Sequence, residues 1–151
     1  MLTEAMKAAA RSSLLLKNLP DSVTEPLLSE AVSKTYNHGE TLFLQGERAK
    51  VIHVILDGWV KLYRISPNGN EAVVRVFTKG YSFGEAVAFR NEEYPVSGEA
   101  VTNCKVLQFS SPSLIAKMNE QPEVCLSVVA SMAQHMHALM SQLEQMKAQT
   151  G

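Results

Sequence analysis

The fold is decided by residues 59–70, which read WVKLYRISPNGN. From Trp59 to Ile65 the side chains fall into two alternating sets, which is the period of a β-strand whose two faces meet different surroundings. The Asn68-Gly69 pair that follows accepts the positive φ that tight hairpin turns require. This stretch therefore predicts a strand and a turn, the start of an antiparallel hairpin.

Similar short runs lie on both sides of this hairpin. Each run is rich in β-branched or aromatic residues and ends at a turn that carries glycine. The expected strands are residues 41–45, 51–56, 59–65, 72–78 and 105–110. Many short strands separated by such turns are typical of a sandwich, a barrel or a jelly roll. We therefore predict a mainly β fold with flanking helices.

Helical sequence lies at both ends of the β region. The N-terminal segment is expected to be helical with a break at Pro20, and Ser22 with Glu25 has the spacing of a capping box. A short helix is expected over residues 111–118, and Pro122 suits the first turn of a long helix. The predicted organisation is N-terminal helices in residues 1–34, a β-roll sensor in residues 35–111 and C-terminal helices in residues 112–151.

The long C-terminal helix carries an apolar repeat that begins at Cys125. Its 4-3-4-3-4-3 spacing is the a/d pattern of a coiled coil. A single terminal helix cannot bury such a stripe along its whole length against a small β-roll, so we predict a homodimer. Alternatively the stripe packs only on its own domain. Val128, Ala133 and Met140 lie off the seam and are expected to face the roll, so that one helix serves both surfaces. The predicted dimer-interface residues are Val129, Met132, Met136, Leu139, Leu143 and Met146.

Charge and composition exclude several classes of protein. The formal net charge of −1 does not supply the basic surface that phosphates require, so DNA contact is expected only through a domain outside this chain. Cys104 and Cys125 do not have the spacing of a metal finger and indicate free thiols in a reducing cytosol. No run approaches the roughly 18 apolar residues needed to span a bilayer. We expect a cytoplasmic protein without membrane contact.

Three motifs occur in a fixed order along the β region. They are HGETLF with QGE within residues 38–47, GWVKLY at residues 58–63 and GYSFGE at residues 80–85. Together they resemble the cyclic-nucleotide-binding domain superfamily, and specifically the Crp/Fnr transcription regulators. The resemblance implies a double-stranded β-helix, or jelly roll, followed by a dimerisation helix. It also implies that DNA is read by a helix-turn-helix domain, which we expect to be absent from this chain.

The third motif resembles the start of the phosphate-binding cassette, and the resemblance implies roles for its residues. Glu85 matches the carboxylate that holds the ribose of cyclic AMP. Residues 93–97 contain no arginine for the cyclic phosphate, and Leu139-Met140 stands where a polar pair meets the purine, so cyclic AMP is disfavoured. Arg75 and Arg90 are the remaining candidates for a phosphate partner. The candidate pocket residues are Phe83, Gly84, Glu85, Ala86, Val87, Tyr94, Pro95, Val96, Ser97, Leu139 and Met140.

The identity of a cofactor stays open. Two distant cysteines cannot hold an iron–sulfur cluster. The stretches GEAVAF at residues 84–89 and YPV at residues 94–96 are similar to regulators of the dissimilative nitrate respiration type, which implies haem as a candidate. The candidate haem ligands are His53, His135 and His137, and each has an ordinary alternative as a strand or solvated helix residue. No other metal site is predicted.

The residues favour a sensor over an enzyme. Only His53 lies within a predicted inner strand, which does not supply the three-ligand site of a cupin-type metalloenzyme. The nucleophile elbow, the zinc-protease helix and the P-loop are all absent from the sequence. We expect that a small-molecule effector or a redox event in the β-roll shifts the helix pair and, with it, a DNA-binding domain. The alternative is a stand-alone cyclic-nucleotide-binding or interaction module.

Overall fold

The computed structural model describes the backbone of residues 2–150 and their side chains, except those of residues 86, 138–139, 142–143 and 145–150. Helices open and close this part of the chain, and strands with one short helix lie between them. The helices are α1 (Glu4–Arg11), α2 (Asp21–Glu30), α3 (Glu85–Phe89), α4 (Ser111–Glu120) and α5 (Pro122–Thr150). The strands are β1 (Val32–Tyr36), β2 (Thr41–Phe43), β3 (Val51–Asp57), β4 (Val60–Ile65), β5 (Glu71–Phe77), β6 (Ser82–Phe83), β7 (Ser97–Ala100) and β8 (Cys104–Ser110).

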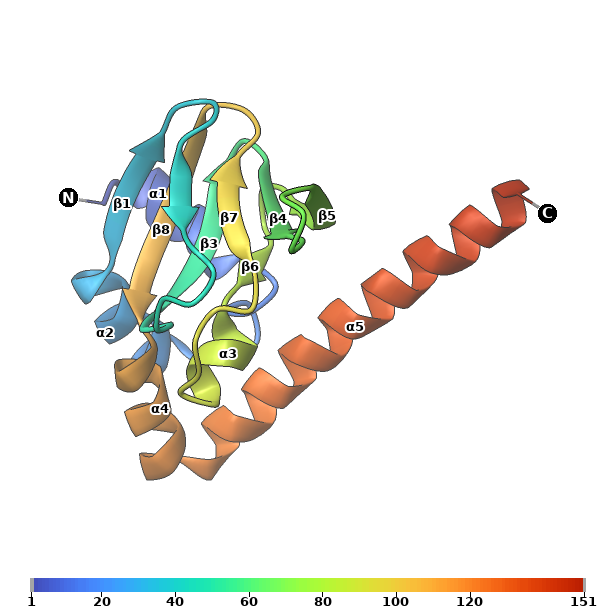
Figure 1. Cartoon of the computed structure of the whole chain (residues 1–151). Helices are drawn as coiled ribbons and strands as arrows, with labels where there is room; N and C mark the ends of the chain where they lie inside the picture. The colour runs from blue at the N-terminus through green and yellow to red at the C-terminus, as the bar shows by residue number, and fades with distance from the viewer. Residues whose placement is uncertain (1, 151) are drawn as a thin grey trace.

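The strands form two four-stranded sheets with antiparallel pairing throughout. One sheet has the order β1-β8-β3-β6 and the other has the order β2-β7-β4-β5. Residues of both sheets share one buried cluster, so the sheets face each other as in a jelly roll. The predicted mainly β fold with flanking helices is confirmed, and Figure 1 shows α1, α2 and α4 beside the roll.

Strand β3 separates two parts of the core and is buried on both faces. Because side chains alternate along a strand, Ile52 and Val54 point towards the helices, whereas His53 and Ile55 point into the roll. A slip of one residue would exchange these two faces, so the burial pattern fixes the register of β3. The helix-side part of the core also includes Leu16, Leu27, Phe109, Leu114 and Val128.

The N-terminal helices differ from the sequence prediction at two points. The prediction of helix up to residue 34 is wrong, because α2 ends at Glu30 and β1 begins at Val32, paired with β8. The predicted capping box is also wrong, since α2 starts at Asp21 behind Pro20 without a side-chain cap, and Ser22 lies inside the helix. Proline at the N-cap leaves the first turn to be held by packing of the buried side chains that follow.

Strands β6 and β7 are missed by the sequence pattern, and β2 ends at Phe43, two residues earlier than predicted. β6 has only two residues, which is too short for a periodic signal. β7 contains Gly98, against which the ring of Phe43 packs so closely that a Cβ would lie 2.6 Å from ring atom Cε1. The glycine that weakens the strand pattern is thus required by the ring that crosses it.

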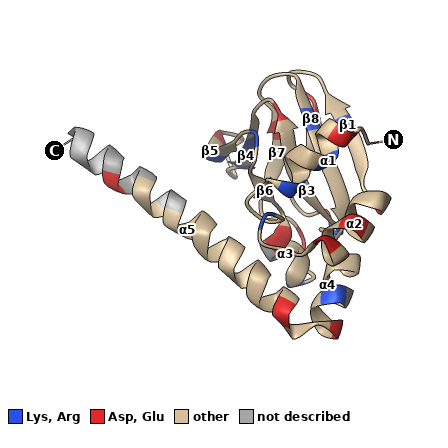
Figure 2. Cartoon of the chain, turned by 180° about the vertical axis from the view of Figure 1, so that it is seen from behind, with Lys and Arg blue, Asp and Glu red and all other residues tan. Residues whose placement is uncertain are grey.

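Helix α5 begins on the domain and then runs away from the roll, as Figure 1 shows. Its first turns pack on the core through Val124 and Val128, which are buried. Residues 124–143 contain no Lys, Arg, Asp or Glu, and the described part of this stretch is free of charge colour in Figure 2. No described helix combines the length and the apolar character needed to cross a bilayer.

Candidate functional site

The cassette motif forms the turn from β6 into α3. Gly84 has a φ of +91°, and a Cβ at this position would lie 3.4 Å from the carbonyl oxygen of Val51. The positive φ and the close approach together favour glycine here. The turn places Glu85 at the first position of α3, where the residue is only 8% exposed. A glycine turn thus carries a carboxyl group into the interior.

One carboxyl oxygen of Glu85 accepts a hydrogen bond and the other does not. Its Oε1 accepts a hydrogen bond from the Ser82 hydroxyl at 3.3 Å, whereas Oε2 is buried with no hydrogen-bond partner in the described part of the chain. Burial raises the pKa of Glu85 above its ordinary value, although hydrogen bonds from its own backbone N–H and from Ser82 act in the opposite direction. A buried acceptor without a partner is costly, so this carboxyl group suits a ligand that donates a hydrogen bond.

Helix α5 forms the wall that faces Glu85. Ser131, Met132 and His135 line, with Glu85, a cavity of about 10 Å³, which is roughly the space that one water molecule needs. The Nε2 atom of His135 is also buried without a hydrogen-bond partner among the described residues. Burial, with a smaller contribution from Arg75, lowers the pKa of His135. Two unsatisfied polar atoms, one from the cassette and one from α5, therefore line one small cavity.

The segment between α1 and α2 fastens α5 to the roll. The buried Ser131 hydroxyl donates to the carbonyl oxygen of Leu15 at 3.1 Å, and the amide of Asn18 donates to the Ser131 hydroxyl at 3.2 Å. The same segment is tied to the roll, because the backbone N–H of Leu14 donates to the carbonyl oxygen of Gly80 at 3.0 Å. Movement of α5 away from Glu85 would break the two hydrogen bonds of Ser131.

The interior of the roll is filled by stacked rings around His53. The rings of Phe43 and Tyr94 stack with centroids 3.9 Å apart, and those of His53 and Phe83 stack at 4.8 Å. The amide of Gln108 lies 3.3 Å from Nδ1 of His53, and Nε2 lies 3.1 Å from the Tyr94 hydroxyl. Burial lowers the pKa of His53 to about 3, so the ring is neutral near pH 7. A neutral ring that accepts at Nδ1 donates from Nε2.

The two arginines proposed as phosphate partners lie in different places. Arg90 is exposed and pairs with Glu92 at 2.9 Å, outside the interior. Arg75 lies on β5 with its guanidinium 5.5 Å from the ring centroid of Phe77, and its charge acts on His135. Of the two, Arg75 is the one that the structure brings towards the side of the roll that α5 covers.

The structure gathers part of the candidate pocket. Phe83, Glu85, Tyr94 and Val96 are buried, and Phe83 and Tyr94 belong to the ring cluster. Ligand contact by these residues stays a prediction. Val87 is half-buried, whereas Pro95 is exposed and Met140 is 54% exposed. The Ser97 hydroxyl accepts a hydrogen bond from the backbone N–H of Gln45 at 2.9 Å. The side chains of Ala86 and Leu139 lie outside the described residues.

Ser82 and Ser131 are cavity residues that the sequence interpretation missed. Ser82 lies three residues before Glu85 and Ser131 lies four residues before His135. In the second case the spacing puts both residues on one helix face. A polar pair on a face that also carries the buried residues Val124 and Val128 was the available signal.

The three candidate haem ligands have different surroundings. Both ring nitrogens of His53 lie within hydrogen-bond distance of side chains in the roll, and His137 is exposed on α5. His135 faces the aromatic side of the roll, with its ring centroid 5.8 Å from that of Phe77 and 5.5 Å from that of Tyr81. Of the three, His135 combines a buried nitrogen that has no hydrogen-bond partner among the described residues with an apolar wall. The cavity of about 10 Å³ beside it does not accommodate a porphyrin in this arrangement.

The apolar stripe of α5 follows a different line from the predicted one. Val129 and Met136 are 60% and 63% exposed, as expected of seam residues, but Met132 is half-buried against the core of its own domain. The side chains of Leu139, Leu143 and Met146 lie outside the described residues. Of the off-seam residues predicted to face the roll, Val128 does so, whereas Ala133 and Met140 are exposed. The described exposed stripe is Leu126, Val129, Ala133, Met136 and Met140, with a 3-4-3-4 spacing.

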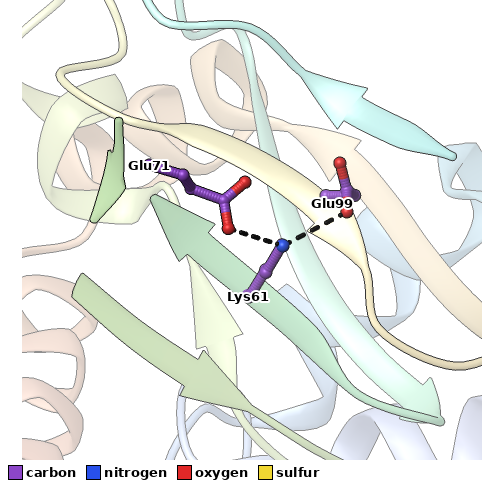
Figure 3. A network of polar contacts seen from close by, with 3 residues as sticks. All are labelled: Lys61, Glu71 and Glu99. Carbon is purple, nitrogen blue, oxygen red and sulfur yellow. Dashed lines mark hydrogen bonds and ion pairs between the residues drawn. The ribbon is translucent and has the colours of Figure 1, made fainter. Parts of the chain in front are cut away.

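A charged cluster lies apart from this site, on the outer face of the second sheet. Figure 3 shows Lys61 of β4 between Glu71 of β5 and Glu99 of β7, with Nζ–O distances of 2.8 and 3.3 Å. The ammonium group also lies 5.4 Å from the centroid of the Tyr63 ring. Both glutamates raise the pKa of Lys61. The cluster joins three neighbouring strands and has a structural role.

Comparison with known proteins agrees with this geometry. The sequence profile of the cyclic nucleotide-binding domain matches residues 33–121, which is more than half of the chain. The chain belongs to the cyclic nucleotide-binding domain family. The match runs from β1 through the cassette to the end of α4, and so covers both sheets.

Relatives of this cyclic nucleotide-binding domain include bacterial regulators. The cyclic AMP receptor protein of Thermus thermophilus is 24% identical over 126 residues, which cover 83% of this chain and 58% of that protein. A solved structure from Ruegeria pomeroyi, assigned as a cyclic nucleotide-binding protein, is 56% identical with a TM-score of 0.82, and the match covers 96% of this chain and 64% of that one. The chain thus spans less than two thirds of each of these relatives.

Two further comparisons show how far the similarity to known proteins extends. The regulator DNR of Pseudomonas aeruginosa aligns over 97% of this chain and 65% of that one with a TM-score of 0.84 at 22% identity, and this likeness shows the fold alone. A lysophospholipase of Phaeosphaeria nodorum is 24% identical over 68% of this chain, but the match covers only 7% of the enzyme. The chain is therefore similar to only a small part of the enzyme. It is a CRP-like sensor domain.

Proposed function

We propose that this domain is the effector-sensing and dimerisation part of a Crp/Fnr-type transcription regulator, and that it passes a ligand or redox signal to a DNA-binding domain. The single observation that carries the proposal is the position of α5. One face of this helix covers the cassette carboxyl group of Glu85, and the other face exposes an apolar, uncharged stripe. A helix that contacts both the cassette and a second subunit links effector binding to the arrangement of the dimer.

The effector of this site is a molecule other than cyclic AMP. Residues 93–97 offer no arginine for a cyclic phosphate, and stacked rings fill the roll beside the cassette. Of the relatives named for cyclic AMP, the Thermus thermophilus protein is 24% identical and a regulatory protein of Silicibacter pomeroyi is 56% identical. The case against cyclic AMP therefore rests on the residues of this chain, because one fold can hold different ligands. The unsatisfied Oε2 of Glu85 favours an effector that donates a hydrogen bond.

Haem is the second candidate, and one observation favours it. His135 presents a neutral, unsatisfied Nε2 beside Phe77, Tyr81 and Met132, which is the ligand and wall chemistry that a haem iron prefers. Such a group would supply binding of a diatomic gas or a redox change. Because the present space does not hold a porphyrin, entry requires α5 to separate from the roll and the Ser131 hydrogen bonds to break.

The test is a pair of titrations on the purified chain, one with haem followed by absorbance and one with cyclic AMP followed by calorimetry. We expect no heat from cyclic AMP. If haem is the cofactor, a saturable Soret shift will be lost in His135→Ala and kept in His137→Ala, a matched control on the exposed side of the same helix. Heat from cyclic AMP would overturn the effector assignment. A monomer in sedimentation at all concentrations would overturn the proposed sensor dimer.

A further inference from the structure

A second pocket lies beside the end of the cassette helix α3 and is lined by residues other than Glu85. It has a volume of about 450 Å³, which is within the range of small-molecule sites. Ala88 and Phe89 of α3 form one wall, and Ile115 of α4 forms the opposite wall. The cavity that Glu85 lines shares none of these residues, so the two sites are separate.

The pocket combines apolar walls with a positively charged rim. The rim carries Arg48 and Lys50 from the connection between β2 and β3, and both side chains are exposed. The lining, which consists of described residues throughout, contains no aspartate or glutamate. Two cations without a carboxylate beside an apolar cavity are complementary to an anion that has an apolar body.

The rim is held in place by hydrogen bonds at both ends. Nη1 of Arg48 donates to the carbonyl oxygen of Asn91 at 3.0 Å and to its side-chain Oδ1 at 3.2 Å. Asn91 has a φ of +53°, and no other non-glycine residue in the described ranges has a positive φ. At the other end, the carbonyl oxygen of Lys50 accepts from the backbone N–H and hydroxyl of Ser111, at 3.2 and 3.0 Å. The guanidinium keeps further N–H donors for a ligand.

We propose that this pocket is a second ligand site, which binds a small organic anion with an aromatic or branched aliphatic body, such as an aryl carboxylate. The anionic group lies against Arg48 and Lys50, and the body lies between α3 and α4. A ligand there contacts the helix that carries Glu85 and the helix that leads into α5. The site acts on the proposed sensor without occupying its effector cavity. The proposal is independent of the effector's identity.

The experiment uses isotope-labelled protein and three probes of similar shape: benzoate, benzamide and benzylamine. We expect benzoate to shift the amide resonances of residues 48–50, 88–91, 111 and 113–119, benzamide to bind more weakly, and benzylamine not to bind. Lys50→Gln should weaken benzoate about tenfold, because a hydrogen bond to a charged group is lost. Lys79→Gln, an exposed lysine outside the pocket lining, is the matched control and should leave the affinity unchanged.

A second variant tests the cavity itself. Ala116→Phe places a ring in the pocket and should abolish the benzoate shifts, whereas Ala8→Phe on the exposed face of α1 should leave them intact. Equal binding of all three probes would overturn the proposal, and so would the absence of saturable shifts with benzoate. Benzoate shifts confined to residues 82–85 and α5 would also overturn it, because they would place the anion at the effector cavity. The titrations with haem and cyclic AMP test the proposed function separately.

Discussion

The two faces of α5 differ sharply although they share one uncharged stretch of sequence. Residues of the inward face are almost completely buried: Val124, Val128 and Ser131 are 0%, 1% and 2% exposed. Residues of the outward face are open: Leu126, Val129 and Met136 are 72%, 60% and 63% exposed. Val128 and Val129 are neighbours in the sequence and belong to opposite faces. The same residue type therefore serves two different surfaces within one turn of helix.

This difference separates what the domain needs for its own stability from what it offers to a partner. The inward face fills the core and carries Ser131 and His135 to the cassette. The outward face contributes nothing to that core, and a helix that is apolar all round is normally buried on all sides. The proposed second copy of the chain, docked along this stripe, would explain the composition of the outward face.

The largest effect is expected from a charge on the inward face. Val128→Asp places an unpaired carboxylate in the core, which should lower the free energy of unfolding by about 4 kcal/mol. The same change one residue later, Val129→Asp, should alter the unfolding free energy of the monomer by less than about 0.5 kcal/mol. Urea denaturation at a concentration where both variants are monomeric gives the two values. Equal losses would show that the two faces are not distinct.

The next effect concerns association rather than folding. Val129→Asp combined with Met136→Asp puts two charges per chain into the exposed stripe and should raise the dimer dissociation constant at least about a hundredfold. Sedimentation velocity over a concentration series measures this constant. Ala130→Asp, an exposed position beside the stripe, is the control and should have a much smaller effect. A dimer that survives the double substitution would refute the seam.

The sequence predicts the β fold well because its signals are local. The strand predicted after Trp59 and the turn at Gly69 depend on neighbouring residues, and both occur in the structure. Burial along β4 does not alternate strictly, because an irregularity in its pairing with β5 shifts the register between Leu62 and Tyr63. Strand β7 is not predicted because its glycine, Gly98, is explained only by the ring of Phe43, which lies 55 residues earlier in the chain and packs on it. The predicted end of the N-terminal helix is wrong because residues 32–36 pair with β8, a strand far along the chain, and this pairing ends the helix earlier.

The site is predictable only in part for a related reason. Glu85 follows from its motif, but its unsatisfied oxygen depends on Ser82, α5 and the segment around Leu15 coming together. The heptad pattern predicts an exposed apolar stripe on α5, but it assigns to that stripe Met132, which faces the roll. Packing of Met132 on the core rotates the exposed stripe, so that Ala133 and Met140 belong to it. The sequence repeat predicts that α5 has an apolar face, whereas tertiary packing determines which of its residues face the roll and which stay exposed.

A smaller effect, dependent on pH, is expected under the inward face. Because the pKa of Glu85 is raised in the fold, the protonated carboxyl is favoured there. Its contribution to stability is fully present below the ordinary value of 4.5 and is lost as the pH rises towards the raised pKa. Glu85→Gln should therefore stabilise the protein at pH 7, on the order of 1 kcal/mol, and the gain should vanish near pH 4.

Urea denaturation of both proteins from pH 4 to pH 8 measures this difference. His53 acts in the opposite direction, since its pKa of about 3 makes the protein less stable as the pH falls below 6.5, but this contribution is common to both proteins and cancels. Ser82→Ala with the Glu85 carboxyl kept should not reproduce the gain. A variant that is no more stable than the parent at pH 7 would indicate that Glu85 Oε2 is satisfied in solution.

The smallest effect is expected far from α5, at the cluster of Figure 3. Lys61 is 21% exposed between Glu71 and Glu99, so solvent screens much of its attraction. Lys61→Met should lower the free energy of unfolding by less than about 1 kcal/mol, and this loss should shrink in 1 M salt, where the screening length is about 3 Å. Lys79→Met, which removes an exposed lysine from the loop before β6, serves as the control. Because the contacts described for this cluster join β4, β5 and β7 and include no described residue of α5, the dimer dissociation constant should not change. A change in that constant would mean that the outer sheet belongs to the same interface as the outward face of α5.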